Sequence, residues 1–227
     1  SWTVPLPLHY GNRIASLPGV AAVSPVNMVD GVYGSQNEIL WAMASDPEVI
    51  LKTYTEWQLP PEQRQAFVRE RVALLVGRTV AEKHGWKVGD QIHLESANYR
   101  VILDLVLRGI YSSREDETML FFHWDYLNEL QGRPDKPGAF WVLAENSDDA
   151  RRLTRDIDAL FSREPMQTLT QPMKQFVLSF LAMLGNVKLI LVSISAAVVF
   201  AVLLIVANTM GMAIREHDRG RNAHEDQ

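Results

Sequence analysis

The hydrophobic residues of this chain are concentrated towards its carboxy-terminal end. The nineteen residues from Leu189 to Ala207 carry no charge, and the uncharged run continues to Ile214. At about 1.5 Å per residue, a helix of this length nearly spans the ~30 Å hydrocarbon core of a bilayer. A buried core helix is the alternative, but core helices rarely stay uncharged on every face over so many turns. The pattern therefore predicts a transmembrane helix.

The residues that flank this run extend the prediction. Phe176, Phe180 and Met183 recur at helical spacing after Pro172, which predicts a stalk helix that leads into the span. Lys188 precedes the span, whereas a group of arginines follows it, and basic residues favour the cytoplasmic side. We therefore expect four parts, namely an outer domain (1–172), a stalk helix (173–188), a transmembrane helix (189–214) and a cytoplasmic tail (215–227).

Small side chains share one face of the predicted transmembrane helix. Ser193, Ala197 and Ala201 recur every four residues, and Ala207 with Gly211 repeats the spacing further along. Small residues let helix backbones approach closely in a membrane, so this face is the candidate contact with a neighbouring helix. The alternative is that alanines merely populate a membrane helix, because such ladders also arise by chance.

The first 172 residues mix two periodicities and predict an α+β fold rather than a doubly wound sheet. Val72 to Val76 is a continuous apolar run, typical of a strand buried on both faces. Gln91 to Glu95 alternates polar and apolar residues and predicts a hairpin with Tyr99 to Leu107. A strand from Val20 to Val23 is expected to end at Ser24-Pro25. Further strands are predicted at 32–33, 39–44, 119–122 and 139–143, and helices at 6–16, 78–84, 124–130 and 147–161, with two more opening at Pro47 and Pro60.

One turn is the candidate structural site of the outer domain. The sequence from Trp86 to Asp90 follows a predicted helix that Gly85 caps, and it leads into a strand. Gly89 is expected to need a positive φ, and Trp86 is expected to pack on the strand from Val72 to Val76. We therefore expect Trp86, Gly89 and Asp90 to fix this part of the fold.

Composition argues against several classes of function. Residues 1–172 carry 17 Lys and Arg against 23 Asp and Glu, so the outer domain is acidic and nucleic acid is not an expected partner. The chain has no cysteine and therefore no thiol nucleophile, disulfide or zinc knuckle. Its six histidines show no metal-ligand spacing, and Val76-Gly77-Arg78 lacks the lysine and the spacing of a P-loop. We expect no cofactor, no metal and no enzymatic activity in this chain.

Five short motifs follow one another in a fixed order. They are Leu17-Pro18-Gly19-Val20 with Val23-Ser24-Pro25, then Val76-Gly77-Arg78, then Gly85 to Asp90, then Arg108-Gly109-Ile110-Tyr111, and finally Asn208-Thr209-Met210 with Arg215-Glu216. Each motif alone is weak, but five in order before a membrane helix make a specific signal. In order and spacing they resemble the periplasmic core domain and second membrane helix of FtsX/MacB-like ABC transporter permeases. The resemblance covers nearly all of the chain.

The resemblance implies a permease of the bacterial inner membrane with four membrane helices. Its large outer domain, a mixed α/β domain in the periplasm, lies between the first and second helices. The implied partners are a cytoplasmic ABC ATPase subunit, a second permease copy that is either identical or different, the lipid bilayer and, as an option, a periplasmic adaptor. The ATPase activity belongs to the separate subunit, and the permease transmits ATP-driven motion to its periplasmic domain for export or extraction of a substrate.

Two features differ from a complete permease. The chain begins at Ser1 rather than at a methionine, and Gly220 to Gln227 is polar where the family continues with a basic and then an apolar stretch. We therefore interpret the chain as a fragment or processed product, with truncation or a reading-frame error at its end.

Two other functions stay open from the sequence. The first is a single-pass, membrane-anchored extracytoplasmic binding or sensor domain, which a neighbouring ATPase gene would argue against. The second is an anchored hydrolase that uses His123 and Asp125, for which the sequence offers no serine in a nucleophile-elbow motif.

Overall fold

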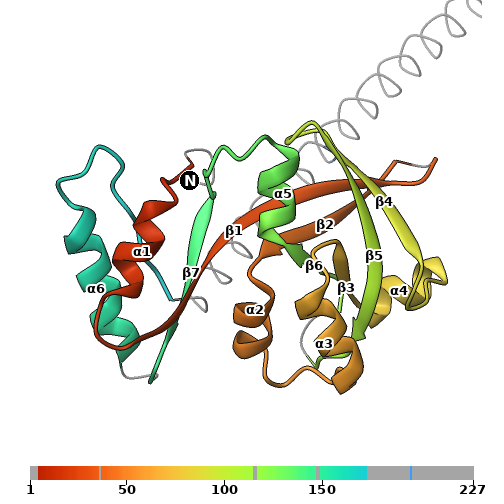
Figure 1. Cartoon of the computed structure of the whole chain (residues 1–227), viewed down its shortest axis with the longest axis horizontal. Coiled ribbons are helices and arrows are strands. Elements are labelled where there is room, and N and C mark those ends of the chain that lie inside the picture. The colour runs from red at the N-terminus through yellow and green to blue at the C-terminus, as the bar shows by residue number, and fades with distance from the viewer. Residues whose placement is uncertain (1–4, 36, 115–116, 147–148, 173–194, 196–227) are drawn as a thin grey trace, which may run out of the picture. The chain divides into compact units, whose positions relative to one another are not determined.

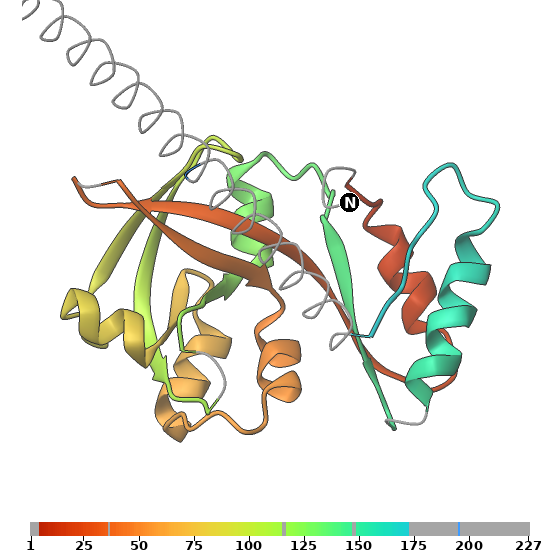
Figure 2. The ribbon, with the colours of Figure 1, turned by 180° about the vertical axis from the view of Figure 1, so that it is seen from behind.

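The computed structural model describes residues 5–35, 37–114, 117–146, 149–172 and 195. The chain divides into two units, Ser1–Thr170 and Gln171–Gln227. All of the helices and strands named below belong to the first unit (Figures 1 and 2). The predicted stalk helix, transmembrane helix and cytoplasmic tail lie outside the described residues, apart from Ser195.

The described part of the first unit is a mixed α/β domain with six helices and seven strands. The helices are α1 (His9–Ala15), α2 (Pro47–Thr53), α3 (Pro61–Arg69), α4 (Arg78–His84), α5 (Trp124–Leu130) and α6 (Ala150–Phe161). The strands are β1 (Val20–Tyr33), β2 (Glu38–Ser45), β3 (Ala73–Gly77), β4 (Gln91–Ser96), β5 (Val101–Tyr111), β6 (Leu120–His123) and β7 (Ala139–Ala144). The mixture of helices and strands that the sequence predicts is confirmed.

Six of the strands close into a ring. Their order is β2-β6-β3-β5-β4-β1, and the additional pairing of β1 with β2 joins the two ends. The β2–β6 and β3–β5 pairs are parallel, whereas the other neighbours are antiparallel. Successive side chains of a strand point to opposite faces, so alternate residues of each strand fill the ring. The resulting apolar core includes Leu74, Leu94, Leu105 and Phe122.

Helices α2 and α3 cover the outside of β3 and β6. A second core cluster forms there and includes Ile50 of α2, Phe67 of α3, Leu75 of β3 and Phe121 of β6. Because one face of β3 lies in the ring core and the other under the helices, all five of its residues are buried. The prediction of a doubly buried strand in this region is confirmed.

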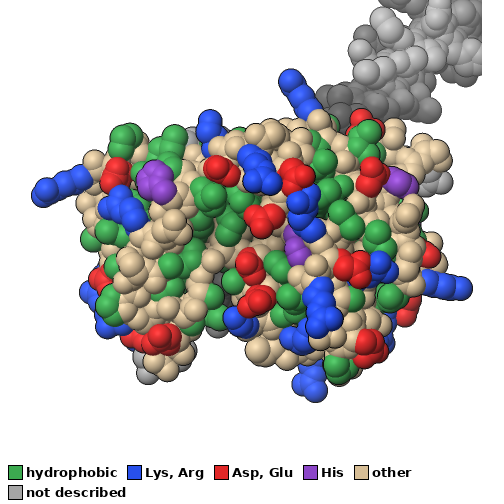
Figure 3. Space-filling model, in the orientation of Figure 1, with side chains coloured by type: hydrophobic (Ala, Val, Ile, Leu, Met, Phe, Trp, Pro, Cys, Tyr) green, Lys and Arg blue, Asp and Glu red, His purple; other side chains and the backbone are tan. Residues whose placement is uncertain are grey.

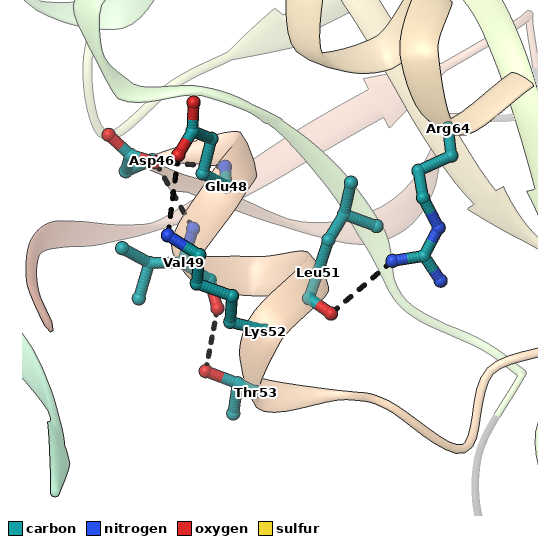
Figure 4. A network of polar contacts seen from close by, with 7 residues as sticks. All are labelled: Asp46, Glu48, Val49, Leu51, Lys52, Thr53 and Arg64. Carbon is teal, nitrogen blue, oxygen red and sulfur yellow. Dashed lines mark hydrogen bonds and ion pairs between the residues drawn. The ribbon is translucent and has the colours of Figure 1, made fainter. Parts of the chain in front are cut away.

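The start of α2 is fixed by the side chain of Asp46, the residue directly before the helix (Figure 4). The Asp46 carboxylate accepts hydrogen bonds from the N–H groups of Glu48 and Val49, at 2.8 and 3.1 Å. This N-cap satisfies two donors that the first turn of a helix leaves without a partner. At the other end, Arg64 of α3 donates to the carbonyl oxygen of Leu51 at 3.5 Å. The two covering helices are therefore connected to each other as well as to the ring.

The first half of β1 leaves the ring and builds a second part of the domain, here called the helical lobe. Val20 to Val26 pairs antiparallel with β7, and α1 and α6 pack on this pair. The two helices lie side by side at the left of Figure 1. The core of the helical lobe consists of Tyr10, Ile14, Leu153, Ile157 and Phe161.

The sequence predicts a strand that ends at Ser24-Pro25, and this prediction is wrong. β1 continues through both residues to Tyr33. Directly after Val26, β1 changes its partner from β7 to β2. The Ser24 hydroxyl lies 2.7 Å from the Ser45 hydroxyl and accepts the N–H of Asp46 at 2.8 Å. Residues that usually end a strand mark a change of partner here, because a proline is tolerated where ladder bonding is interrupted.

The other elements lie close to their predicted positions. α4 and α5 have the predicted bounds, and Gly85 ends α4 in the left-handed conformation with φ of 68°. β5 is longer than predicted, since it continues to Tyr111. Residues 147–148, which the sequence predicts as part of the cap of α6, lie outside the described residues.

The chain segment that precedes β6 passes directly over Gly77. A Cβ at this position would lie 2.0 Å from the carbonyl oxygen of Glu117. Gly77 has an ordinary φ of −67°, so steric contact alone excludes a side chain. We predict that Gly77→Ala lowers the free energy of unfolding by about 3 kcal/mol, because the backbone of Glu117 must shift. Urea denaturation of a soluble protein of residues 1–172 measures this loss.

Gly34→Ala is the matched control for Gly77→Ala. Gly34 has φ of +68° and open space where a Cβ would lie, so alanine there adds backbone strain without a clash. Its expected cost is about 1 kcal/mol. Equal losses in the two variants would contradict the steric explanation.

Candidate functional site

The predicted turn between α4 and β4 is held by hydrogen bonds within the turn and to β5. Gly89 has φ of +105°, as predicted. Its N–H donates to the carbonyl oxygen of Leu107 at 2.8 Å, and the N–H of Leu107 donates to the carbonyl oxygen of Asp90 at 2.9 Å. The Asp90 carboxylate accepts the N–H of Lys87 at 2.8 Å. The turn therefore attaches the end of α4 to the strand β5.

The indole of Trp86 is buried in the core of the ring. It donates from Nε1 to the hydroxyl of Tyr33 at 3.0 Å, and the two rings meet edge to face at 4.9 Å. The imidazole of His84 stacks on it with ring centroids 4.8 Å apart. The predicted partner strand contributes Leu74 and Val76 to the same core cluster. Sequence reasoning missed Tyr33, because no local pattern connects two residues that are 53 positions apart.

The predicted helix-packing residues Ser193, Ala197, Ala201, Ala207 and Gly211 lie outside the described residues. Within the part of the chain that the structure describes, no helix has the length and apolar character needed to cross a membrane. The face of small side chains therefore stays a prediction from the sequence.

An aromatic stack joins the segment after α2 to the end of β5. The ring of Trp57 lies between Tyr54 and Tyr111, with centroids 4.2 and 4.0 Å away and nearly parallel planes. The ring of Trp141 in β7 contacts the ring of Tyr54 edge to face, with centroids 6.0 Å apart. Through this contact the stack also connects the helical lobe to the ring.

A cavity of about 390 Å³ opens beside the stack. It is lined by Glu56, Gln58, Ser112, Ser113 and Arg114. Gln58 and Ser112 exchange two backbone hydrogen bonds, at 3.0 and 3.1 Å, which join the segment after α2 to the end of β5. The described lining residues include no histidine, so they do not provide the serine–histidine pair of a hydrolase.

Large apolar side chains are exposed on the outside of the ring. Ile39 and Trp41 of β2 are 57% and 51% exposed. Ile39 pairs with Val32 of β1, Val32 with Glu95 of β4, and Glu95 with Ile102 of β5, which is 61% exposed. A mostly apolar row of outward side chains thus crosses four strands. Such rows are candidate contact surfaces rather than sites of chemistry.

Charge and metal chemistry receive little support from the described residues. Among them, no group of three His, Cys, Asp or Glu could hold a metal ion. Side chains of both signs are interspersed on the face of the domain that Figure 3 shows. Among the described residues, Arg108 forms an ion pair with Glu70 at 2.6 Å, and Lys83 forms one with Glu38 at 2.7 Å. The face in this view therefore has no large patch of positive or negative charge that would attract a charged partner.

The contacts of His123 indicate a structural role for this residue. Its Nε2 lies 2.6 Å from the carbonyl oxygen of Phe67, and a carbonyl oxygen only accepts, so Nε2 carries the proton. The side chain is buried, and burial lowers the pKa of His123 below its ordinary value although the hydrogen bond to Phe67 opposes this. The imidazole connects the end of β6 to α3 instead of pairing with Asp125.

The sequence matches a known family of domains, and the fold is similar to solved structures. Residues 2–160 match a family model described as MacB-like periplasmic core domain. The extracellular domain of the noncanonic ABC-type transporter YknZ from Gram-positive bacteria aligns at 12% identity over 73% of this chain and 87% of its own, with a TM-score of 0.53. The periplasmic region of MacB from Actinobacillus actinomycetemcomitans aligns at 13% identity over 77% and 83%, with a TM-score of 0.50. A search of curated proteins gave no match.

Gly89→Val tests the turn. Nothing lies within 4 Å of a Cβ built at Gly89, so the expected cost is the strain of valine at φ of +105°. A strain of about 2 kcal/mol lowers the melting temperature of a domain of this size by roughly 5 °C. Thermal unfolding of residues 1–172 measures the shift. Val88→Ala, at an exposed position of the same turn, should leave the melting temperature unchanged; an equally unchanged Gly89→Val variant would refute the role of the turn.

The buried His123 predicts a pH dependence of stability. Its pKa is lower in the folded than in the unfolded chain, so the unfolded chain binds more protons once the pH falls below about 6.5. The stability contributed by the neutral imidazole is therefore present above that pH and is lost progressively as the pH falls further. His123→Gln, whose amide can still donate to Phe67, should show a smaller loss of unfolding free energy between pH 7.5 and pH 5 in urea denaturation.

His9→Gln is the control for this effect, because His9 is exposed on α1. It should keep the pH dependence of the unsubstituted protein. A His123→Gln variant that loses stability with acid as strongly as the His9→Gln variant would show that His123 is not responsible.

Proposed function

Because the chain belongs to the family of MacB-like periplasmic core domains, we propose that it is the permease subunit of an FtsX/MacB-type ABC transporter. In this proposal residues 1–172 stand on the periplasmic side of the inner membrane. A separate cytoplasmic ATPase supplies the energy, and the permease passes ATP-driven motion to its outer domain. That motion exports a substrate or extracts it from the membrane.

The observation that carries the proposal is the match of residues 2–160 to the family. In this proposal the uncharged run from Leu189 to Ala207 forms a membrane helix on the carboxy-terminal side of the matched region. The chain has no P-loop, so the proposal assigns ATP hydrolysis to another subunit. Its further partners are a second permease copy, the lipid bilayer and, as an option, a periplasmic adaptor.

The two-part architecture suits a domain that passes on motion. The ring strands pair in a closed order, so the ring has no edge from which it could open strand by strand. The helical lobe is connected to it through β1, through the Ser24 and Ser45 hydroxyls, and through Trp141 against Tyr54. A displacement of the helical lobe therefore reaches the ring along a continuous strand, as in domain movements that pivot on shared elements.

The test is purification of the complete permease from its native membrane in mild detergent. We expect a P-loop ATPase to co-purify with it, and the complex to hydrolyse ATP in a vanadate-sensitive way. Replacing the P-loop lysine of that ATPase should abolish hydrolysis while the two proteins still purify together, because the lysine contacts phosphate and not the permease. Permease that purifies without any ATPase, with or without nucleotide, would contradict the proposal and favour a single-pass sensor domain.

A further inference from the structure

The chain that follows α6 returns to α1 and is fixed there by polar contacts. Arg13 donates from Nη1 to Glu164 Oε1 at 2.6 Å and from Nη2 to the carbonyl oxygen of Leu160 at 3.3 Å. Its guanidinium also lies 4.8 Å from the centre of the Phe161 ring. One side chain of α1 thus holds the last turn of α6 and the residues that follow it.

A second residue of α1 binds the same segment. Tyr10 is buried and stacks on Phe161 with ring centroids 4.1 Å apart. Its hydroxyl donates to the carbonyl oxygen of Met166 at 3.3 Å. Because stacking fixes the ring, the hydroxyl is held at one place, and it positions the backbone of the returning segment at Met166.

The far end of the segment is bound to α6. The carboxylate of Asp158 accepts a hydrogen bond from the Thr168 hydroxyl at 3.2 Å and another from the backbone N–H of Thr170 at 2.9 Å. Gln167 donates to the carbonyl oxygen of Ser162 at 3.2 Å. From Glu164 to Thr170 the segment is therefore bonded at intervals of one or two residues.

Burial does not explain this arrangement. Leu169 is 85% exposed and Met166 is 37% exposed, so the segment gains little from the hydrophobic effect. An ion pair as exposed as that of Arg13 and Glu164 also contributes little to stability on its own. The contacts instead determine the position of the chain where it leaves the described domain.

We propose that α1, the end of α6 and residues 164–170 form a clamp that makes the chain leaving the domain move together with α1. Arg13, Tyr10 and Asp158 act as positioning residues of this clamp. The proposal rests on the function proposed above, because it supposes that ATP-driven motion reaches the domain through the chain after Thr170. Without the clamp, that motion would extend residues 164–170 before it displaced the helical lobe.

The experiment uses the complete permease in complex with its co-purified ATPase. Hydrogen exchange of the peptides that contain α1 and residues 164–172 is measured with and without ATP and vanadate. In the unsubstituted complex, we expect slow exchange at the N–H of Thr170 and a nucleotide-dependent change in α1. In Arg13→Glu and in Glu164→Arg, exchange across 164–172 should rise at least about tenfold and the nucleotide response of α1 should be lost, while the rate of ATP hydrolysis is kept.

The double variant Arg13→Glu/Glu164→Arg restores opposite charges and should recover part of the response of α1, because a glutamate at position 13 cannot replace the hydrogen bond to the carbonyl oxygen of Leu160. Lys52→Glu is the matched control, because it reverses a charge in an exposed ion pair of α2, with Glu48, and should behave like the unsubstituted complex. A normal α1 response in both single variants would overturn the clamp while leaving the proposed function intact. A double variant that recovers none of the response would also overturn it. If the unsubstituted complex shows no nucleotide response anywhere in the domain, the clamp and the proposed function fail together.

Discussion

The domain depends on one strand that belongs to two sheets. β1 pairs with β7 in its first half and with β2 in its second half. Every backbone N–H and C=O that loses its partner at the change must find another, because an unpaired buried group costs about as much as a lost hydrogen bond. The hydroxyl of Ser24 helps here, since it contacts Ser45 and accepts the N–H of Asp46. A shift of β1 by one residue would turn side chains out of both cores at once.

Elements whose cause is local could be predicted from the sequence. α4 ends where Gly85 adopts a left-handed conformation, and α5 lies between the strands that the sequence predicts at 119–122 and 139–143. β3 was recognisable because burial on both faces removes the polar alternation of an ordinary strand. The continuity of β1 through Pro25 and the closure of the ring could not be predicted in the same way. Both result from pairing between strands that are distant in the sequence, which leaves no periodic trace.

The candidate site also contains features with a local cause, which could be predicted, and contacts between distant residues, which could not. Gly89 could be identified because a turn between a capped helix and a strand calls for a positive φ, whatever surrounds it. The partner of Trp86 could not, since Tyr33 is 53 positions away in the sequence and only the fold brings the two residues together. The same holds for the contacts of α1 with the end of the domain. Arg13 and its partner Glu164 are 151 residues apart in the sequence, and Tyr10 and its partner Met166 are 156 residues apart. The face of small side chains around Ala197 has a helical basis in the sequence, and its packing stays a prediction.

The pairing of β1 with β2 has a mechanical consequence. Seven residue pairs, from Asn27 with Ala44 to Tyr33 with Glu38, join the two strands without an interruption of register. A force directed along β1 loads these backbone bonds in shear, so that they resist together, whereas a force across the pair would open them one after another. The second half of β1 therefore resists extension when it is pulled along its length. Beyond Val26, towards the amino terminus, the same load passes to the pairing of β1 with β7.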